Sequence, residues 1–308
     1  MDEARSGQRA GRKLGRWARV LGVGLLVVAL AAAGGYFFWP RAVGNPHLRV
    51  AGVPSLHDTG ILPALARDFA VRNGIAAKVV GRKAGSVADL GRRGLADVIL
   101  TNDPTTDEAL SARGLVVGRA TVMSDDFIIV GPLADPAGAK EATTVGEALR
   151  RIADAGALFV GRFDDPGIAA RERLLWRLAA LPPRSDPTGP TPPTWYVPAK
   201  RTGEGLALAS QKGAYTLADR SSFLVHQKDL NLVGVAQGGG EMENVYSALA
   251  IGGGKAGTAP TMAQAAQAFV AYLVSPAGQQ LIANYGADRY PRSLYAPAAP
   301  RQASRFGE

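Results

Sequence analysis

The sequence predicts an α/β protein made of two α/β units followed by a helical segment. Short apolar runs, which are candidates for strands, alternate with segments of helical pattern along most of the chain. In the first unit, strand candidates alternate with helix candidates at 47–52 (strand), 53–70 (helix), 76–81 (strand), 86–95 (helix) and 96–101 (strand). Strand and helix alternating in this way are typical of a parallel, doubly wound sheet.

The first helix candidate illustrates the periodicity. Ile61, Leu62, Leu65 and Phe69 fall on one helical face. Ser55 or Asp58 can cap this helix, and the glycine after Asn73 predicts its end.

The second unit and the C-terminal part follow the same pattern. We expect strands at 120–123, 126–132, 157–161, 214–218, 230–236 and 245–253, and helices at 144–156, after 165, at 205–213 and at 261–286. The last helix is broken at Ser275–Pro276. A Pro-rich insertion at 182–195 predicts a surface loop, and the tail from 297 to 308 is expected to be disordered.

Composition excludes several classes of site. The chain has 308 residues, of which 47% are hydrophobic, so it is long enough for two lobes with real cores. It contains no cysteine, which excludes disulfides, thiolate metal sites and cysteine nucleophiles. The net charge of +9 is partly local, and no basic helix with interleaved aromatic residues is present, so nucleic-acid binding is not favoured.

The N-terminal segment predicts contact with a membrane. Residues 1–19 form a basic head and residues 20–39 are uncharged, which is about the length that a spanning helix needs. The basic head favours a cytoplasmic N-terminus, and the chain after a linker at 40–46 would then be extracytoplasmic. Two alternatives stay open: cleavage near Ala29–Ala31 as a signal peptide, or an uncleaved anchor ending in the aromatic cluster 36–39.

Five motifs stand together in one order: LGRRGLADVILTNDP (90–104), VMSDDFIIVGPLADPAG (122–138), FVGRFDDPGI (159–168), QKGAYTLADR (211–220) and SPAGQQLIANYG (275–286). With this order and spacing, the chain after about His47 resembles the substrate-binding proteins of bacterial ABC importers for tungstate, which are type II periplasmic binding proteins. The resemblance implies two α/β lobes joined by a hinge of two crossing strands, with one oxyanion in the cleft between them. It also implies a permease and a cytoplasmic ATPase as partners, and no cofactor.

The resemblance also implies boundaries. The two crossings would lie near 127–132 and 245–252. Lobe 1 would comprise 47–130 together with 246–296, and lobe 2 would comprise 131–245.

The loop FVGRFDDPGI poses the central chemical question. An oxyanion needs donors: hydroxyls, backbone N–H groups at helix starts and a cation. Where the family has Ser-Arg-Gly-Asp-Asp-Ser-Gly-Thr, this chain keeps Arg162 and both aspartates but has Gly161, Pro166 and Ile168 in place of hydroxyl residues. Arg162 is expected to contact the anion, Asp165 to cap the following helix with Pro166 at its first position, and Asp164 to steady the loop or Arg162.

The other loops at strand ends supply further candidates. Where the family has Thr-Thr-Thr-Ser, this chain reads Gly52-Val53-Pro54-Ser55, so only Ser55 keeps a hydroxyl. Asp58 is expected to act as a cap or to tie the lobe. The predicted ligand-binding residues are Ser55, Ser86, Thr101, Arg162 and Thr216, and the predicted supporting residues are Asp58, Asp164, Asp165, Asp219 and Arg220.

One alternative stays open for the motif that contains Thr216. Thr216 would then be only a strand residue, and Asp219 would cap the next turn and pair with Arg220.

Three functions are compared. The first is a component of an ABC importer that binds an oxyanion, most simply tungstate. The second is a membrane-tethered protein of the same fold, a sensor or accessory, whose ligand site is altered or lost with its hydroxyls. An enzyme is not favoured: Asp164 and Asp165 are adjacent and point to different sides of a helix start, the three histidines are far apart, and no metal or nucleophile motif is present.

Overall fold

The computed structural model describes residues 47–81, 85–182, 193–200, 203–252 and 260–297. Residues 47–308 form a compact unit of their own. The predicted basic head, the apolar segment 20–39, the linker, most of the Pro-rich insertion and nearly all of the C-terminal tail lie outside the described residues. Among those that are described, no helix is long and apolar enough to span a membrane.

Lobe 1 is built on a mixed sheet. β1 (Leu48–Gly52) lies between β2 (Ala77–Val79) and β3 (Val98–Thr101) and is parallel to both, as the alternating pattern predicts. β9 (Glu243–Ile251) is antiparallel to β3, and β4 (Val116–Pro132) is antiparallel to β9. The predicted parallel arrangement is therefore confirmed for β1, β2 and β3, and the two antiparallel strands are those near which the chain passes between the lobes.

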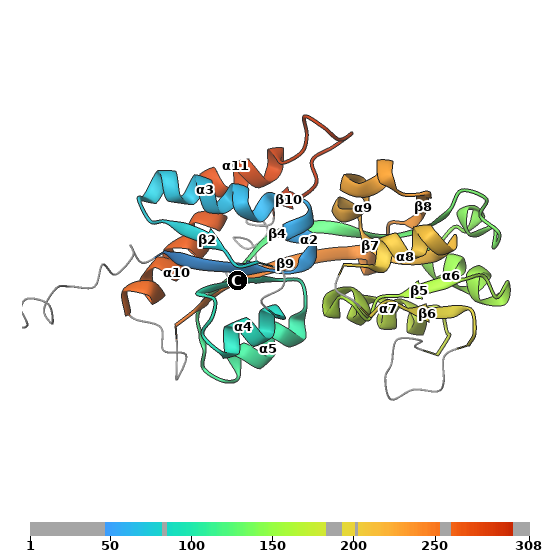
Figure 1. The fold of residues 1–308 in the computed structure, drawn as a ribbon, viewed down its shortest axis with the longest axis horizontal. Helices are drawn as coiled ribbons and strands as arrows, with labels where there is room; N and C mark the ends of the chain where they lie inside the picture. Colours follow the sequence, from blue (N-terminus) through green and yellow to red (C-terminus); the bar gives the residue numbers. More distant parts are fainter. Residues whose placement is uncertain (1–46, 82–84, 183–192, 201–202, 253–259, 298–308) are drawn as a thin grey trace, which may run out of the picture. The chain divides into compact units, whose positions relative to one another are not determined.

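Helices cover both faces of this sheet (Figure 1). α3 (Ile61–Asn73), α10 (Pro260–Val274) and α11 (Pro276–Asn284) pack on one face, where Phe69 meets Phe269 edge to face with ring centroids 4.9 Å apart. α4 (Val87–Arg92) and α5 (Pro104–Ser111) pack on the other. Strand alternation explains the division, since Val98 and Leu100 face the first group and Ile99 the second.

Lobe 2 repeats this architecture on a second sheet. β5 (Phe159–Gly161) is parallel to β6 (Tyr196–Pro198) and to β7 (Tyr215–Asp219). β8 (Leu232–Gln237) pairs with β4. The covering helices are α6 (Val145–Asp154), α7 (Pro166–Leu178), α8 (Gly205–Lys212) and α9 (Arg220–His226).

The chain crosses between the lobes in two places, as the resemblance implies. β4 pairs with β9 up to Asp126, and from Phe127 onward its partners are β7 and β8. The return crossing runs from the end of β8 at Gln237 to the start of β9 at Glu243. The first crossing falls at the predicted position, near residue 127. The second prediction is wrong: residues 245–251 lie within β9 in the sheet of lobe 1, and the chain crosses before this strand, at 238–242.

Local capping follows the sequence closely in two helices. α7 begins after Asp165, whose carboxylate accepts from the backbone N–H groups of Gly167 and Ile168, with Pro166 in the first turn. The break before α11 is capped by Ser275, whose Oγ accepts from the N–H of Gly278 at 3.3 Å. The predicted cap at Asp165 and the predicted break at Ser275–Pro276 are both confirmed, because caps and helix breaks depend on residues next to one another in the chain.

Other local predictions are wrong. The segment 53–70 holds two helices, α2 (Pro54–Asp58) and α3, separated at Gly60, whose φ of 77° favours glycine. Gly60 rather than Ser55 or Asp58 therefore precedes α3. The two strands predicted at 120–123 and 126–132 are parts of one 17-residue strand, β4. Two helices, α5 (Pro104–Ser111) and α9 (Arg220–His226), and two strands, β6 (Tyr196–Pro198) and β10 (Ala296–Pro297), were not predicted.

Candidate functional site

The carboxyl ends of strands from both lobes meet at one cavity of about 930 Å³. An open α/β sheet is expected to bind its ligand at this edge. Lobe 1 contributes the loops after β1, β2 and β3 and the start of α4, and lobe 2 contributes the loops after β5 and β6 and the start of α7. The polar side chains on the wall belong to His57, Ser86, Thr101, Asp103, Thr106, Asp164 and Lys200.

Two of the predicted hydroxyl residues lie on this wall. Thr101 is buried at the end of β3, and its Oγ1 accepts from the N–H of Asp103 at 3.0 Å. Ser86 caps α4 by accepting from the N–H of Asp89 at 3.2 Å. Within the described part of the chain each hydroxyl accepts a hydrogen bond and neither donates one, so each has its proton to offer to a ligand.

Asp103 on the same wall is occupied by its own helix. It precedes α5 and accepts from the N–H of Thr105 at 3.1 Å and from the hydroxyl of Thr106 at 2.8 Å. Its carboxylate is thereby held against the start of α5, where a negative charge is favoured.

Arg162 is engaged inside lobe 2. Its Nε donates to Oδ1 of Asp164 at 2.8 Å, its second terminal nitrogen donates to Oδ2 of Asp164 at 3.2 Å, and its first donates to the carbonyl of Leu217 at 2.8 Å. Burial, the largest single effect, lowers the pKa of the guanidinium. The charge and hydrogen bonds of Asp164, together with the charges of Asp165 and Asp219, outweigh burial and raise that pKa above its ordinary value. Asp164 lies on the cavity wall, whereas Arg162 is not among the residues that line it.

Asp164 steadies both Arg162 and the next loop. Its Oδ2 also accepts from the N–H of Gly203 at 3.1 Å, beside α8. Gly205 packs directly on Arg162, since a Cβ at this glycine would come within 2.3 Å of Nε. The arginine, the aspartate and the start of α8 thus form one buried cluster behind the cavity.

Ser55 and Thr216, also predicted as ligand-binding residues, are not among the residues that line the cavity. Ser55 is buried, with its Oγ 3.2 Å from the hydroxyl of Tyr246. Thr216 is fully buried in β7, and its hydroxyl donates to the carbonyl of Val160 at 2.8 Å. Asp58 belongs to α2 and is half-buried.

A buried polar network joins the crossing strands beside the cavity. Oδ1 of Asp219 accepts from Nδ2 of Asn244 at 2.5 Å and from the hydroxyl of Tyr246 at 3.2 Å. Asn244 in turn accepts from Nδ2 of Asn102, which follows β3, at 3.1 Å. Burial, reinforced by the negative charges of Asp165 and Asp125, raises the pKa of Asp219 to about 8.

Arg220 pairs with Asp125, and not with Asp219 as the alternative interpretation expected. Its guanidinium lies 3.3 Å from Asp125 and donates to the carbonyl of Leu294 at 2.8 Å. Asp219 precedes α9 but makes no capping bond with its side chain. The interpretation that Asp219 caps this turn and pairs with Arg220 is therefore wrong, while Thr216 does lie in a strand.

Two cavity residues were missed because β6 was missed. Lys200 follows β6 and lines the wall, and Gly203 lies just beyond it. The run Trp195-Tyr196-Val197 is rich in residues that favour strands, and this was the available signal. Phe163, with 39% of its surface exposed, also lines the cavity and contacts Tyr196.

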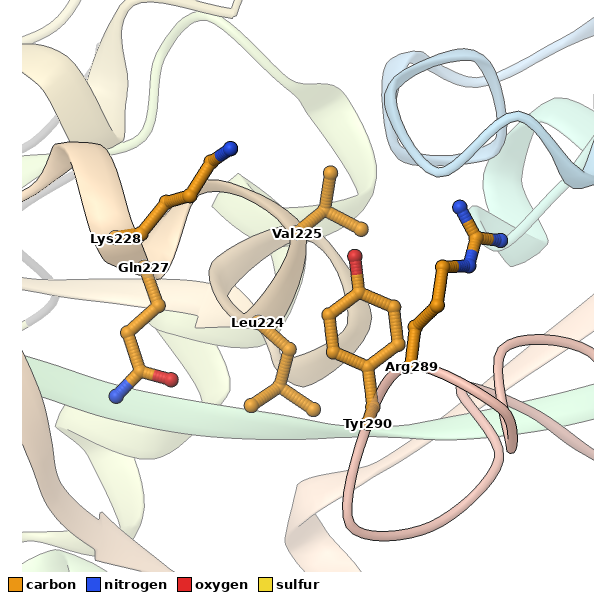
Figure 2. Close-up of a pocket in the computed structure, with 6 residues that line it drawn as sticks. All are labelled: Leu224, Val225, Gln227, Lys228, Arg289 and Tyr290. Atoms are coloured by element: carbon orange, nitrogen blue, oxygen red, sulfur yellow. The ribbon is translucent and has the colours of Figure 1, made fainter.

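A second hollow, of about 490 Å³, lies at the surface between α9 and the turn after α11. Figure 2 shows Leu224 and Tyr290 near its centre, with Lys228 and Arg289 on opposite sides. The guanidinium of Arg289 lies 5.9 Å from the ring centroid of Tyr290 and 3.6 Å from Asp288. The carboxyl ends of the strands do not reach this hollow, so we place the candidate site in the larger cavity.

Comparison with known proteins identifies the family. The family described as the PBP superfamily domain matches residues 41–277. A protein of Haloferax volcanii that carries the name of an ABC transporter anion-binding protein is 35% identical over 85% of this chain and 75% of its own. The tungstate-binding protein TupA of Peptoclostridium acidaminophilum is 32% identical over 82% of this chain and 86% of its own. The crystal structure of the tungstate ABC transporter from Geobacter sulfurreducens superposes with a TM-score of 0.67 at 31% identity, covering 78% of this chain and 98% of that one.

Proposed function

We propose that this chain, which belongs to the PBP superfamily, captures an oxyanion, most simply tungstate, for an ABC importer. The observation that carries the proposal is the cavity between the lobes, whose wall presents Ser86 and Thr101 with protons free to donate. The names of the relatives support the class of ligand. Closure of two lobes on a ligand at a hinge of two strands is the motion that such a fold allows.

In this proposal some of the predicted residues contact the anion and others support the cavity wall. Ser86 and Thr101 donate directly to the oxyanion. Ser55, Arg162 and Thr216 support the wall from behind, since each is buried and bonded within the protein. The first N–H groups of α7 that Asp165 binds are not free for an anion, so donors are fewer than a helix start ordinarily offers.

The proposed partners are a permease and its cytoplasmic ATPase. The binding unit would work outside the cytoplasm, and the apolar segment 20–39 would either anchor it or be removed on export. No chemical step is proposed, because the function is capture and release.

The test uses the unit from residue 41 onward, titrated with tungstate, molybdate, sulfate and phosphate by calorimetry and thermal shift. Ligand at about a thousandfold above its dissociation constant should stabilise the fold by about 4 kcal/mol. The proposal predicts saturable binding of at least one of the four anions at submicromolar affinity. Absence of any response to all four would refute it and would favour the tethered accessory protein instead.

A further inference from the structure

We propose that Lys200 supplies the positive charge that holds the anion in the cavity. The inference rests on the proposed function and names a ligand-binding residue that the strand-end motifs do not include. It follows from the charges on the cavity wall, from the engagement of the arginines elsewhere and from the way the backbone places Lys200.

The wall of the cavity carries more acidic than basic side chains. Among the described residues that line the cavity, Lys200 is the one lysine and there is no arginine. The lining carboxylates are Asp103 and Asp164. A doubly charged oxyanion entering this cavity would meet the carboxylate of Asp103 in lobe 1 and, in lobe 2, a carboxylate whose charge Arg162 balances. Without a cation on the wall, the desolvation of the anion would be poorly compensated.

The two buried arginines near the cavity are committed elsewhere. Arg162 is in an ion pair with Asp164, so the pair presents no net charge to a ligand. Arg220 is bound to the carbonyls of Ser293 and Leu294 and lies beside Asp125. Neither arginine lines the cavity.

The position of Lys200 is fixed by its own backbone. β6 runs parallel to β5 with Pro198 opposite Gly161, and the N–H of Ala199 donates to the carbonyl of Gly161 at 2.9 Å. The N–H of Lys200 donates to the carboxylate of Glu204 at 2.7 Å. These bonds hold the Cα of Lys200 at the carboxyl end of the sheet, next to the loop that carries Asp164.

The side chain of Lys200, in contrast, is exposed and uncommitted. Within the part of the chain that the structure describes, no hydrogen bond or ion pair engages its ammonium group. A mobile point charge on a fixed backbone can follow the anion as the lobes close. A lysine also lacks the planar fork of an arginine, so it contributes affinity with little preference among tetrahedral oxyanions.

The test compares Lys200→Ala with Lys228→Ala, which removes the same charge from an exposed lysine at the second hollow. Tungstate is titrated into both variants and into the unmodified unit by calorimetry. Lys200→Ala should weaken binding by about 10- to 100-fold, the range for a charged hydrogen bond, and Lys228→Ala by less than about twofold. Lys200→Arg, which keeps the charge, should restore most of the affinity.

The outcomes separate the two proposals. If the unmodified unit binds tungstate and Lys200→Ala binds it as tightly as Lys228→Ala does, the role of Lys200 is refuted and the proposed function stands. If the unmodified unit binds none of the four anions, the proposed function itself fails. A thermal unfolding curve for each variant checks that Lys200→Ala folds, as its exposed side chain predicts.

Discussion

Asp219 offers the sharpest test of the electrostatics beside the cavity. The residue is 2% exposed, and two neutral donors, from Asn244 and Tyr246, reach its Oδ1. Burial and the neighbouring carboxylates raise its pKa to about 8, so the folded protein holds this group protonated at neutral pH. Asp219→Asn keeps an oxygen acceptor of the same shape and cannot ionise.

The size of the effect follows from linkage. The pKa is raised on folding, so its contribution to stability is fully present below about pH 4, the ordinary range for an unfolded aspartate, and is lost as the pH rises toward about 8. The loss is about 1.4 kcal/mol per pH unit, or about 2.7 kcal/mol between pH 5 and pH 7. Asp219→Asn should abolish this part of the pH dependence and gain about 2.7 kcal/mol relative to the unmodified protein over that interval.

The assay is urea unfolding of residues 41–308 at pH 5, 6 and 7, with Asp229→Asn as the control for an exposed carboxylate. The difference between the curves of variant and unmodified protein isolates Asp219 from all other titrating groups. The difference should grow with pH for Asp219→Asn and stay flat for Asp229→Asn. A loss of stability in Asp219→Asn that is equal at all three pH values would show that the native group is ionised, and would refute the reasoning.

Three further substitutions test packing and capping. Gly167→Ala places a Cβ 2.4 Å from Oδ1 of Asn102 in the other lobe, and this clash at the cavity should lower tungstate affinity about tenfold, measured by calorimetry. Gly146→Ala is the control: the nearest atom to its added Cβ is 3.7 Å away, and its tungstate affinity should not change. Trp176→Ala removes a fully buried ring that packs on Phe159 at 5.1 Å and should lower the free energy of unfolding in urea by about 3–5 kcal/mol; a loss below about 1 kcal/mol would contradict the packing. Ser275→Ala removes the cap of α11 and should cost about 1 kcal/mol, measured in the same way, with an unchanged value as the contrary result.

The parts of the fold that the sequence predicts are those that local chemistry specifies. The start of α7 could be predicted because Asp165 and Pro166 are each suited to their position whatever the rest of the chain does. β6 could not, because three residues after a Pro-rich segment become a strand only through pairing with β5. The continuity of β4 was hidden in the same way, since the polar run 124–126 interrupts the apolar pattern where the strand leaves one sheet for the other.

In the candidate site, too, some features could be predicted from the sequence and others depend on contacts that the sequence does not reveal. The strand-end rule points to the loops that hold Ser86, Thr101 and Asp164, which line the cavity, because the rule depends only on strand order and direction. The partner of Arg162 could not be predicted from residue type, since a guanidinium suits a carboxylate and an oxyanion equally well. The choice is made by the loop, which returns Asp164 to within 2.8 Å of Nε two residues later.

The buried acidic groups of lobe 2 and of the adjoining crossing explain why an exposed residue, rather than a buried arginine, would supply the positive charge of an anion site here. Asp125, Asp165, Glu172 and Asp219 are all buried, and burial raises the pKa of each of them. A buried carboxyl that ionises needs a cation or several donors nearby. Arg162 is held among these groups by contacts that the fold requires, and turning it toward a ligand would leave Asp164 buried without its partner. A lysine on an exposed loop carries no such penalty, which is the physical reason to expect the loss of affinity in Lys200→Ala to be larger than its loss of stability.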